Sequence, residues 1–373
     1  MSVKRLLVVG DFCSGSGLTR FIFNTFSCFD KSKFNIQCVG YGLDPNRETD
    51  KKCKELGWHL NRVIPVTKNP VGHIKWWRKF LKGNEFDFIY FNYSSSWNYY
   101  PVKLAKKYTN AKIICHSHNS YYSHVFNNKI LMNLLNRIND KGKKFFNEVA
   151  DIKIATSEEA ALWMFDTLKD VTIINNGIRL NDFKFDEKAR KELRARLNIP
   201  SNNKLVGFAG AFQRRKNPIF ALQIFAEYVK DNPNSTLLII GKGPLKNVID
   251  EKVCSLNIEK KVKFISYTDK LNKWYSAMDV LLFPSLYEGF GLVPLEAQVS
   301  NLPVLASDKV ASEVFITKNI NKIKGFNKED WVRNLEEAEF KTNNVRLKMN
   351  SSLNKFDVKK QVTQISKLIE NQI

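Results

Sequence analysis

The sequence contains no apolar run that approaches the roughly 18 residues needed for a membrane-spanning helix. Near its start, Lys4 and Arg5 precede a short apolar run that ends at Gly10 and Asp11. That run is too short for a signal peptide and is typical of a first buried strand. We therefore expect no leader segment and a protein that works in the cytoplasm.

Cysteine is sparse and irregularly placed. The six cysteines include no C-x-x-C pair, which argues against a zinc site or a disulfide scaffold and fits a reducing compartment. There is also no Asp-x-Asp sequence, a pattern that holds a divalent cation in many enzymes. His116 and His118 lie two positions apart but have no third ligand at a metal-binding spacing. The sequence thus predicts no metal and no cofactor.

Acidic residues are few: 37 Asp and Glu stand against 59 Lys and Arg, which gives a formal net charge of +22. Residues 51–150 alone hold 18 basic and 5 acidic residues. Such a positive field attracts nucleic acid, an anionic membrane surface or a phosphorylated substrate.

Within this basic segment, residues 73–82 predict an amphipathic helix. Ile74, Trp77 and Phe80 would share one face of the helix, while basic side chains occupy the rest. Two interpretations stay open at this stage. The helix either packs its apolar face into the core or lies in a membrane interface.

The length of 373 residues is typical of two domains. Apolar strands alternate with loops and amphipathic helices, which indicates α/β domains with parallel sheets. In the first half we expect strands at residues 5–9, 36–39, 63–65, 88–91, 112–115, 152–155 and 171–174, and helices at 18–29, 73–82, 101–108, 129–150 and 158–168.

The same scheme restarts after a charged segment, residues 181–203, which we interpret as a hinge. The strands expected beyond it lie at residues 204–210, 236–240, 262–265, 280–283 and 304–306. The predicted architecture is two Rossmann-like, doubly wound parallel-sheet domains facing a central cleft. Their bounds are 1–183 and 184–355, and a last helix at 356–373 is expected to pack back on the first domain.

The most informative segment is residues 288–296, which reads EGFGLVPLE. It follows an expected strand and enters a helix, so Glu288 would lie in a loop and Glu296 about two turns inside the helix. The first amides of a helix have no internal partner and carry the positive end of the helix dipole. This arrangement predicts a diphosphate site with an acidic residue on each side. The alternative is an ordinary strand–helix junction with two surface glutamates.

Other loops at expected strand ends are weaker signals. Gly210 begins a loop that presents cations at 214–216 just before a helix, and Gly241 begins a glycine turn. In the first half, a turn with Gly15 and Gly17 could wrap a phosphate or a sugar, although it lacks the third glycine of a dinucleotide fingerprint. Each of these loops is also compatible with an ordinary solvated turn.

Together these motifs resemble the retaining GT-B glycosyltransferases of glycosyltransferase family 4, in particular members from bacterial exopolysaccharide and capsule biosynthesis. The resemblance spans nearly the whole chain, and the E-x7-E segment is its most specific element. Supporting matches lie at residues 116–119, 155–160, 174–178, 210–217, 241–245 and 284–290. The chain departs from the family at Ala211, where members commonly carry arginine, and we infer that Arg215, in preference to Arg214, supplies the guanidinium instead. Ser266 replaces a frequent glycine, which leaves recognition of the base near residues 265–268 less well defined.

The resemblance implies roles for the charged residues of the second half. Glu288 would approach hydroxyls of the transferred sugar, and Glu296 would bind the ribose. Lys216 and Arg215 would neutralise the leaving diphosphate, so that catalysis needs no metal.

The resemblance also implies donor-binding backbone in both halves. The amides that would hold the diphosphate and sugar are those of Phe290, Gly291 and Leu292. Gly210 and Gly241 would lie beside them. From the first half, the turn at Gly15 and Gly17 would close over the phosphates, and His118 would touch the transferred sugar.

The function implied is a transferase that moves a hexose or N-acetylhexosamine from a nucleotide sugar, with UDP preferred. The acceptor would be a saccharide, carried on a membrane lipid and bound by the N-terminal domain. The basic first half would rest on the anionic inner face of the plasma membrane. The alternatives are a nucleotide-sugar epimerase of GT-B fold and a non-catalytic partner subunit that binds an anionic surface. Nucleic acid is not an expected partner, because no motif for binding it is present.

Overall fold

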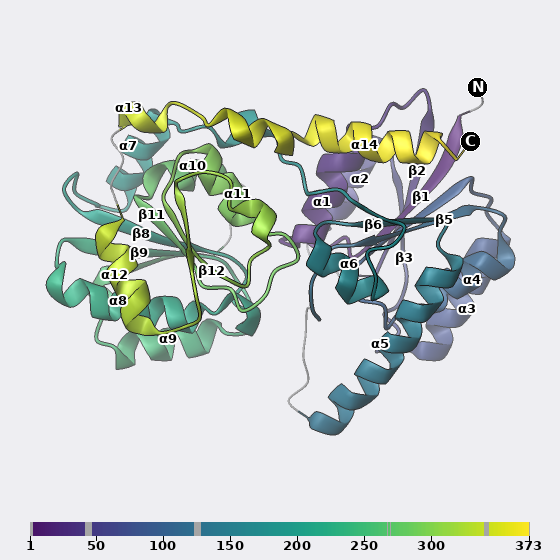
Figure 1. The fold of residues 1–373 in the computed structure, drawn as a ribbon, viewed down its shortest axis with the longest axis horizontal. Helices are drawn as coiled ribbons and strands as arrows, with labels where there is room; N and C mark the ends of the chain where they lie inside the picture. The colour runs from purple at the N-terminus through teal and green to yellow at the C-terminus, as the bar shows by residue number, and fades with distance from the viewer. Residues whose placement is uncertain are drawn as a thin grey trace. The chain divides into compact units, whose positions relative to one another are not determined.

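The computed structural model describes residues 3–41, 47–122, 128–266, 268, 270–338 and 343–372. The chain divides into two compact units, one of Met1–Gly177 with Val358–Ile373 and the other of Ile178–Asp357 (Figure 1). The sequence placed the division after residue 183. Leu180 and Phe183 pack in the core of the second unit, and the segment after Gly177 therefore belongs with that unit.

The first unit is built on a seven-stranded parallel sheet with the order β3-β2-β1-β4-β5-β6-β7. Leu6 of the first strand pairs with Ile36 on one side and Phe88 on the other, and this register keeps apolar residues in line across the sheet. The strands are β1 (Lys4–Gly10), β2 (Phe34–Gly40), β3 (His59–Arg62), β4 (Phe88–Tyr93), β5 (Lys112–Ser117), β6 (Ile152–Ala155) and β7 (Val171–Ile173).

Helices cover both faces of this sheet, each with its own buried cluster. One face carries α1 (Gly17–Phe26), α2 (Glu48–Leu56) and α14 (Val358–Glu370). The other carries α3 (Pro70–Lys82), α4 (Tyr100–Tyr108), α5 (Lys129–Val149) and α6 (Glu158–Phe165).

The apolar face of α3 packs into the core. Trp77 and Leu81 are buried in the cluster under this helix, and Phe80 packs against the same cluster. Of the two interpretations of residues 73–82, the structure therefore shows the core-packing one.

The last helix, α14, is anchored on the first unit. Ile365 and Ile369 are fully buried in its core. The Gln361 side-chain oxygen accepts hydrogen bonds from the amide of Gly177 at 3.0 Å and from the hydroxyl of Thr25 at 3.3 Å. A Cβ on Gly177 would lie 2.7 Å from Cα of Val358, and glycine is therefore required where the chain passes α14.

The second unit has a six-stranded parallel sheet with the order β10-β9-β8-β11-β12-β13. Its strands are β8 (Lys204–Ala209), β9 (Ser235–Ile240), β10 (Val262–Ile265), β11 (Val280–Phe283), β12 (Val304–Ser307) and β13 (Ile320–Ile323). One face carries α8 (Pro218–Asp231), α9 (Lys246–Ser255) and α12 (Lys328–Glu337), and the other carries α10 (Leu271–Ala277) and α11 (Leu292–Val299). The remaining helical segments are α7 (Glu187–Arg196), α13 (Asn343–Arg346) and the 3-10 turns η1 (Leu180–Phe183), η2 (Arg214–Lys216), η3 (Glu259–Lys261), η4 (Ser312–Val314) and η5 (Ser351–Phe356). The predicted α/β architecture of two doubly wound parallel-sheet domains is confirmed.

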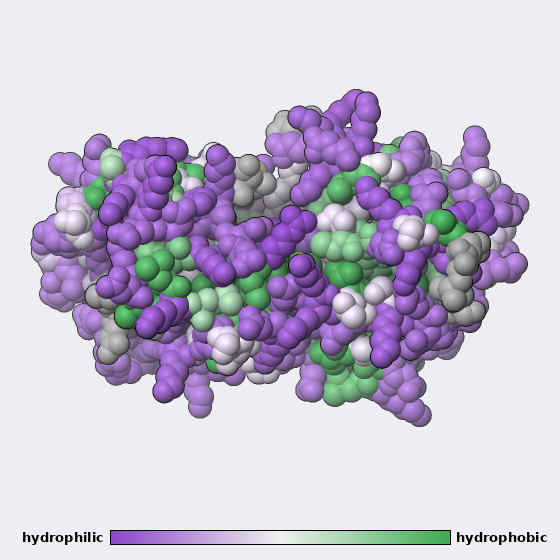
Figure 2. Space-filling view, turned by 90° about the horizontal axis from the view of Figure 1, so that it is seen from above, coloured by the Kyte–Doolittle hydropathy of each residue, from purple (hydrophilic) through white to green (hydrophobic). Residues whose placement is uncertain are grey.

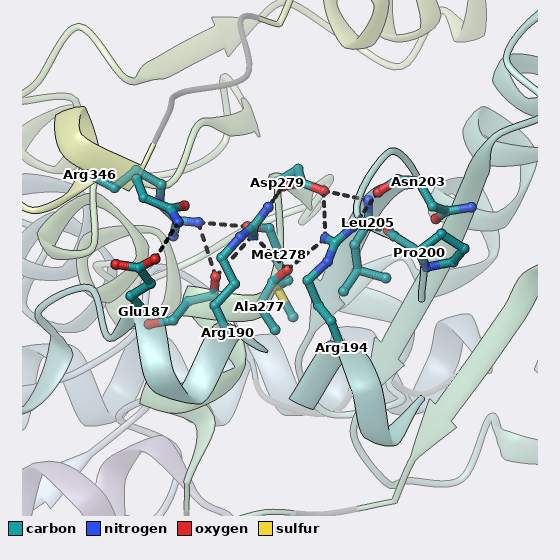
Figure 3. Close-up of polar contacts among 12 residues, drawn as sticks. Glu187, Arg190, Arg194, Pro200, Asn203, Leu205, Ala277, Met278, Asp279 and Arg346 are labelled. Carbon is teal, nitrogen blue, oxygen red and sulfur yellow. Dashed lines mark hydrogen bonds and ion pairs between the residues drawn. The ribbon is translucent and has the colours of Figure 1, made fainter. Parts of the chain in front are cut away.

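The charged segment interpreted as a hinge instead contains α7, which packs within the second unit through hydrogen bonds and ion pairs (Figure 3). Arg190 and Arg194 donate to the Asp279 carboxylate at 2.5 and 2.9 Å. Asp279 immediately precedes β11, and one of its oxygens also accepts the amide of Leu205 in β8 at 2.7 Å. The charges of α7 are therefore used to hold the helix against the two central strands.

Arg346 of α13 completes this polar cluster (Figure 3). Its guanidinium donates to the carbonyls of Tyr275 at 2.7 Å and Met278 at 2.8 Å, at the end of α10. It also donates to the carbonyl of Ser300, directly after α11, at 3.1 Å. Burial and the neighbouring Arg190 lower the pKa of Arg346 to about 9. A guanidinium at the ends of two helices meets their unpaired carbonyls and fixes α10 and α11 together.

The surface is mostly hydrophilic on the face drawn in Figure 2, where apolar side chains gather in separate patches. Among the helices of the described residues, none has the length and apolar character to cross a bilayer.

Candidate functional site

The candidate site of the second unit lies where its strand order reverses. From the adjacent strands β8 and β11 the chain proceeds in opposite directions, to β9 and β10 on one side and to β12 and β13 on the other. Ligands of open α/β sheets bind outside the carboxyl ends of strands at such a point. The loops that follow β8 and β11 are joined there, because the amide of Leu286 donates to the carbonyl of Arg215 at 2.7 Å.

Glu288 lies at the centre of a buried cluster of charges between these loops. The Lys216 ammonium donates to Oε1 of Glu288, and Nη1 of Arg215 lies 3.4 Å from both carboxylate oxygens. Glu288 and Lys216 are 7% and 9% exposed, so the pair is removed from water. Burial alone would raise the pKa of Glu288, but Lys216 and Arg215 outweigh burial and hold that pKa below its ordinary value.

The amino end of α11 completes this cluster. Gly291 precedes the helix with φ of 105°, a left-handed conformation that favours glycine. A Cβ there would also lie 3.0 Å from the Val310 side chain. The first helical amides, beginning with Leu292, lack carbonyl partners inside the helix and carry its positive end. The structure thus places two cations and a helix amino end in the same loop cluster.

Glu296 is buried inside α11 and is 1% exposed. Because α11 begins at Leu292, Glu296 lies just over one turn into the helix, and the predicted two turns were wrong. Tyr275 of α10 donates its hydroxyl to Oε2 of Glu296 at 2.8 Å. With both Glu288 and Glu296 buried, the alternative of two surface glutamates does not hold.

Tyr275 is a site residue that sequence reasoning missed. It is fully buried and precedes its carboxylate partner by 21 positions, in a different helix. Its hydroxyl fixes one oxygen of Glu296. Only the contact between α10 and α11 reveals this role, since no local motif marks the tyrosine.

The glycines of the two flanking loops allow these loops to pack closely against each other. A Cβ on Gly241 would lie 2.0 Å from the carbonyl oxygen of Gly210, which only glycine permits. The amide of Phe212 donates to the carbonyl of Lys242 at 2.9 Å, joining the same two loops. Phe290 buries its side chain in the core against Phe356, so only its backbone can take part in binding.

In the first unit, the turn containing Gly15 and Gly17 is held by a carboxylate that the sequence analysis passed over. Ser16 and Thr19 donate hydroxyls to the two oxygens of Asp11 at 2.5 and 2.6 Å. Burial raises the pKa of Asp11, although these donors oppose the rise. Gly15 has φ of 81°, and a Cβ on Gly17 would meet nothing within 4 Å. The hydrogen bonds to Asp11 therefore fix the turn, and open space lies beside Gly17.

His118 follows β5 and is oriented by Asn92. Nε2 of His118 lies 3.0 Å from Oδ1 of Asn92, whose amide nitrogen donates to the carbonyl of Val9 at 3.0 Å. Because the Asn92 amide nitrogen is used in this way, its oxygen faces the imidazole. The bond assigns the proton of neutral His118 to Nε2 and leaves Nδ1 as an acceptor. Burial lowers the pKa of His118 to about 3, and the ring is neutral near pH 7.

His116 is the deeper member of the histidine pair. It is fully buried, and its Nδ1 lies 2.8 Å from the hydroxyl of Tyr90. Burial and the nearby His118 lower the pKa of His116 well below its ordinary value. Within the described residues, no three His, Cys, Asp or Glu side chains are gathered in a group that could hold a metal ion.

Residues 189–352 match the family model described as Glycosyl transferases group 1. Over 320 residues the chain is 27% identical to a protein of Bacillus subtilis (strain 168) named as a glycosyltransferase, EpsF, with 84% of this chain and 81% of that protein covered. It is 28% identical to the lipopolysaccharide core biosynthesis mannosyltransferase LpsB of Rhizobium meliloti (strain 1021), over 47% of this chain and 50% of that protein.

Among solved structures, the fold is shared with HepE of Anabaena in complex with UDP-glucose, with a TM-score of 0.79 at 16% identity over 99% of this chain and 100% of that one. WaaG, a glycosyltransferase involved in lipopolysaccharide biosynthesis, gives a TM-score of 0.72 at 16% identity over 97% and 99% of the two chains. The chain thus has the fold of GT-B glycosyltransferases. Its residues 189–352 match glycosyl transferases group 1, and together these similarities support the interpretation that the chain is a glycosyltransferase.

Proposed function

We propose that this protein is a retaining, metal-independent hexosyltransferase of bacterial surface-polysaccharide synthesis. It takes a hexose or N-acetylhexosamine from a UDP-sugar and transfers it to a saccharide acceptor on a membrane lipid, at the cytoplasmic face of the membrane. The single observation that carries the proposal is the buried cluster of Lys216, Arg215 and Glu288 at the amino end of α11. The complexes of HepE with UDP and with UDP-glucose support the choice of donor.

The diphosphate is bound by the positive groups of this cluster. Lys216 and Arg215 provide side-chain donors, and the amides of Gly291 and Leu292 add the positive end of the helix. A lysine has three donors and an arginine five, so both can bind phosphate while keeping a bond to Glu288. Tyr275 holds Oε2 of Glu296, and the Glu296 carboxylate is assigned to the ribose hydroxyls.

Transfer begins as the bond between the anomeric carbon and the diphosphate oxygen breaks, with its electron pair staying on the diphosphate. The acceptor hydroxyl then forms the new bond on the same face of the sugar, and its proton passes to the departing phosphate oxygen. Negative charge grows on the diphosphate during this step, where Lys216 and Arg215 stabilise it. Glu288 orients the sugar hydroxyls and places a negative charge near the electron-deficient ring.

In the first unit, we assign sugar binding to His118 and phosphate binding to the turn at Gly15 and Gly17. Neutral His118 offers Nδ1 as an acceptor for a sugar hydroxyl, since Asn92 occupies Nε2. The basic excess of residues 51–150 suits a lipid-linked acceptor and an anionic membrane surface.

A transfer assay tests the proposal. The purified chain is incubated with UDP-hexoses or UDP-N-acetylhexosamines, with and without lipid-linked saccharide acceptors and with EDTA. We expect acceptor-dependent release of UDP, unchanged by EDTA, and NMR of the product showing retained anomeric configuration. Epimerised or free sugar without any need for an acceptor would instead identify an epimerase. No turnover with any donor would favour a non-catalytic partner subunit.

A further inference from the structure

Helix α5 has two halves with different surroundings. Its carboxyl half is anchored in the first unit: Phe146 is fully buried, and the Asn139 side chain accepts the amide of Ser96 at 2.8 Å. A Cβ on Gly142 would lie 1.9 Å from the carbonyl oxygen of Ser96, which requires glycine at this contact. The amino half extends beyond the other elements of its unit in Figure 1.

That amino half exposes large apolar side chains to solvent. Ile130 is 79% exposed, Leu131 46% and Leu134 54%. Leu131 and Leu134 continue into the half-buried Leu135 and Ile138, with the i, i+3, i+4, i+7 spacing of a single helix face. Ile130 lies one turn before Leu134 and widens this apolar stripe. Exposed apolar residues so closely grouped mark an interaction surface.

Exposed cations lie on the same helix. The helical spacing puts Arg137 and Lys141 on the edge of the stripe that Ile130 forms, whereas Lys129 at the amino end lies on the opposite side, as does the exposed Asp140. The helix lies in the part of the chain, residues 51–150, that holds 18 basic and 5 acidic residues. Leucines and isoleucines flanked by basic side chains match a surface with an anionic headgroup layer above an apolar layer.

Of the two interpretations that the sequence left open for α3, the structure excludes membrane docking by its apolar face. In α3, Trp77 and Leu81 are buried in the core, and Val71 at its amino end is the large apolar residue that this helix leaves exposed. An element that inserts in a bilayer must expose its apolar residues, and α5 does.

We propose that the amino half of α5 docks in an anionic phospholipid surface, with Ile130, Leu131 and Leu134 inserted among the lipids. The cations of the helix bind the headgroups and give the docking its preference for anionic lipid. This inference goes beyond the transferase reaction, because it assigns the attachment surface and not the chemistry.

The test is vesicle flotation of the full chain. We expect binding to vesicles that contain phosphatidylglycerol and little binding to pure phosphatidylcholine, with the first weakened by salt. The triple variant Ile130→Gln, Leu131→Gln and Leu134→Gln should bind at least about tenfold more weakly, because a large share of the buried apolar area is lost. The variant Lys129→Gln, Arg137→Gln and Lys141→Gln should lose the preference for anionic lipid.

A control removes three exposed apolar residues that lie elsewhere. Leu162, Val248 and Leu347 are 49%, 46% and 57% exposed, and their triple change to Gln should leave vesicle binding unaltered. Melting temperature and UDP release with a water-soluble acceptor check that each variant is folded and active. Unchanged vesicle binding in the α5 triple variant would overturn the proposal, whatever the outcome of the transfer assay. A dimer of the wild-type chain that the α5 variant dissolves, with no vesicle binding by either, would identify a second copy as the partner and also overturn it.

Discussion

At the scale of single residues, the cations assigned to the diphosphate already have a partner. Lys216 and Arg215 both bond to Glu288, which compensates the buried charge of Lys216 and the partly buried charge of Arg215. A bound diphosphate adds negative charge to this cluster and is repelled by the Glu288 carboxylate, although Lys216 and Arg215 have donors enough for both. We therefore expect Glu288 to weaken the binding of the nucleotide while it orients the sugar for transfer.

The variant Glu288→Gln tests this double role. Removing the carboxylate charge removes its repulsion of the diphosphate and leaves the positive charges of Lys216 and Arg215 uncompensated until the diphosphate binds. We expect UDP to raise the melting temperature of this variant more than that of the wild type, while its transfer rate falls at least about 100-fold. An equal or smaller UDP-induced shift would show that the cations do not meet the diphosphate.

Lys216→Ala and Glu296→Ala are expected to reduce turnover severely, for different reasons. Loss of one donor that stabilises the leaving group typically costs about 3–4 kcal/mol in the barrier, or roughly 100- to 1,000-fold in kcat. Loss of Glu296 removes the proposed ribose contact and should act mainly on KM for the donor. Tyr275→Phe removes only the hydrogen bond to Glu296 and should weaken donor binding by about 1 kcal/mol. Steady-state kinetics separate these effects, and near-wild-type rates in Lys216→Ala or Glu296→Ala would contradict the assignment.

The lowered pKa of His118 predicts how the free energy of unfolding depends on pH. Its pKa is lowered to about 3 in the folded chain, so below an ordinary value of about 6.5 the unfolded chain binds the extra proton. The contribution of His118 to stability is therefore present above pH 6.5 and is lost as pH falls toward 3. We expect His118→Gln to flatten the loss of unfolding free energy in this range by up to about 1.4 kcal/mol per pH unit, the value for one proton. Urea unfolding between pH 4 and 7 measures it, and an unchanged slope would show that His118 titrates normally.

The sequence revealed the charged residues of the site but not their supports. Glu288 and Glu296 stand out because a glycine-rich turn separates them before a helix. Tyr275 and Asn92 are invisible at this level, since each meets its partner only after separate strands and helices have packed. Asp11 had a local signal, its position at the carboxyl end of β1 directly before the Ser-Gly-Ser-Gly turn.

At the scale of elements, prediction succeeded where apolar patterning is strong. β6 has the predicted bounds, whereas the edge strand β3 lies at His59–Arg62 and not at residues 63–65. α2 was not predicted, because its sequence ETDKKCKEL is mostly charged and buries only Thr49 and Cys53. α7 was interpreted as part of a hinge for a similar reason: its arginines look solvated until Asp279 is placed beside them.

The Asp279 cluster predicts a large effect on stability. Asp279→Asn would leave Arg190 and Arg194 without their carboxylate in a largely buried position. Breaking a buried ion pair by removing one partner costs about 3–5 kcal/mol. Denaturant unfolding of the variant measures the loss.

Asp330→Asn is the control for Asp279→Asn. It removes an exposed ion pair with Arg333 in α12 and should cost no more than about 1 kcal/mol. Similar losses in the two variants would mean that the cluster in Figure 3 contributes no more than a surface pair.

At the scale of the whole molecule, the alternation of strands and helices was enough to predict two doubly wound units. The return of α14 to the first unit could be anticipated from its amphipathic sequence, and its anchors, Gln361 and the close contact at Gly177, could not. In both units the motifs singled out from the sequence follow the carboxyl ends of central strands, where this fold binds its ligands.

The most direct test of the account is a crystal structure of the chain with UDP bound. We predict that the diphosphate contacts the amides at the amino end of α11 together with Lys216 and Arg215, and that the ribose contacts Glu296. A nucleotide bound elsewhere, with the ion pair of Lys216 and Glu288 undisturbed and the amino end of α11 empty, would contradict the account.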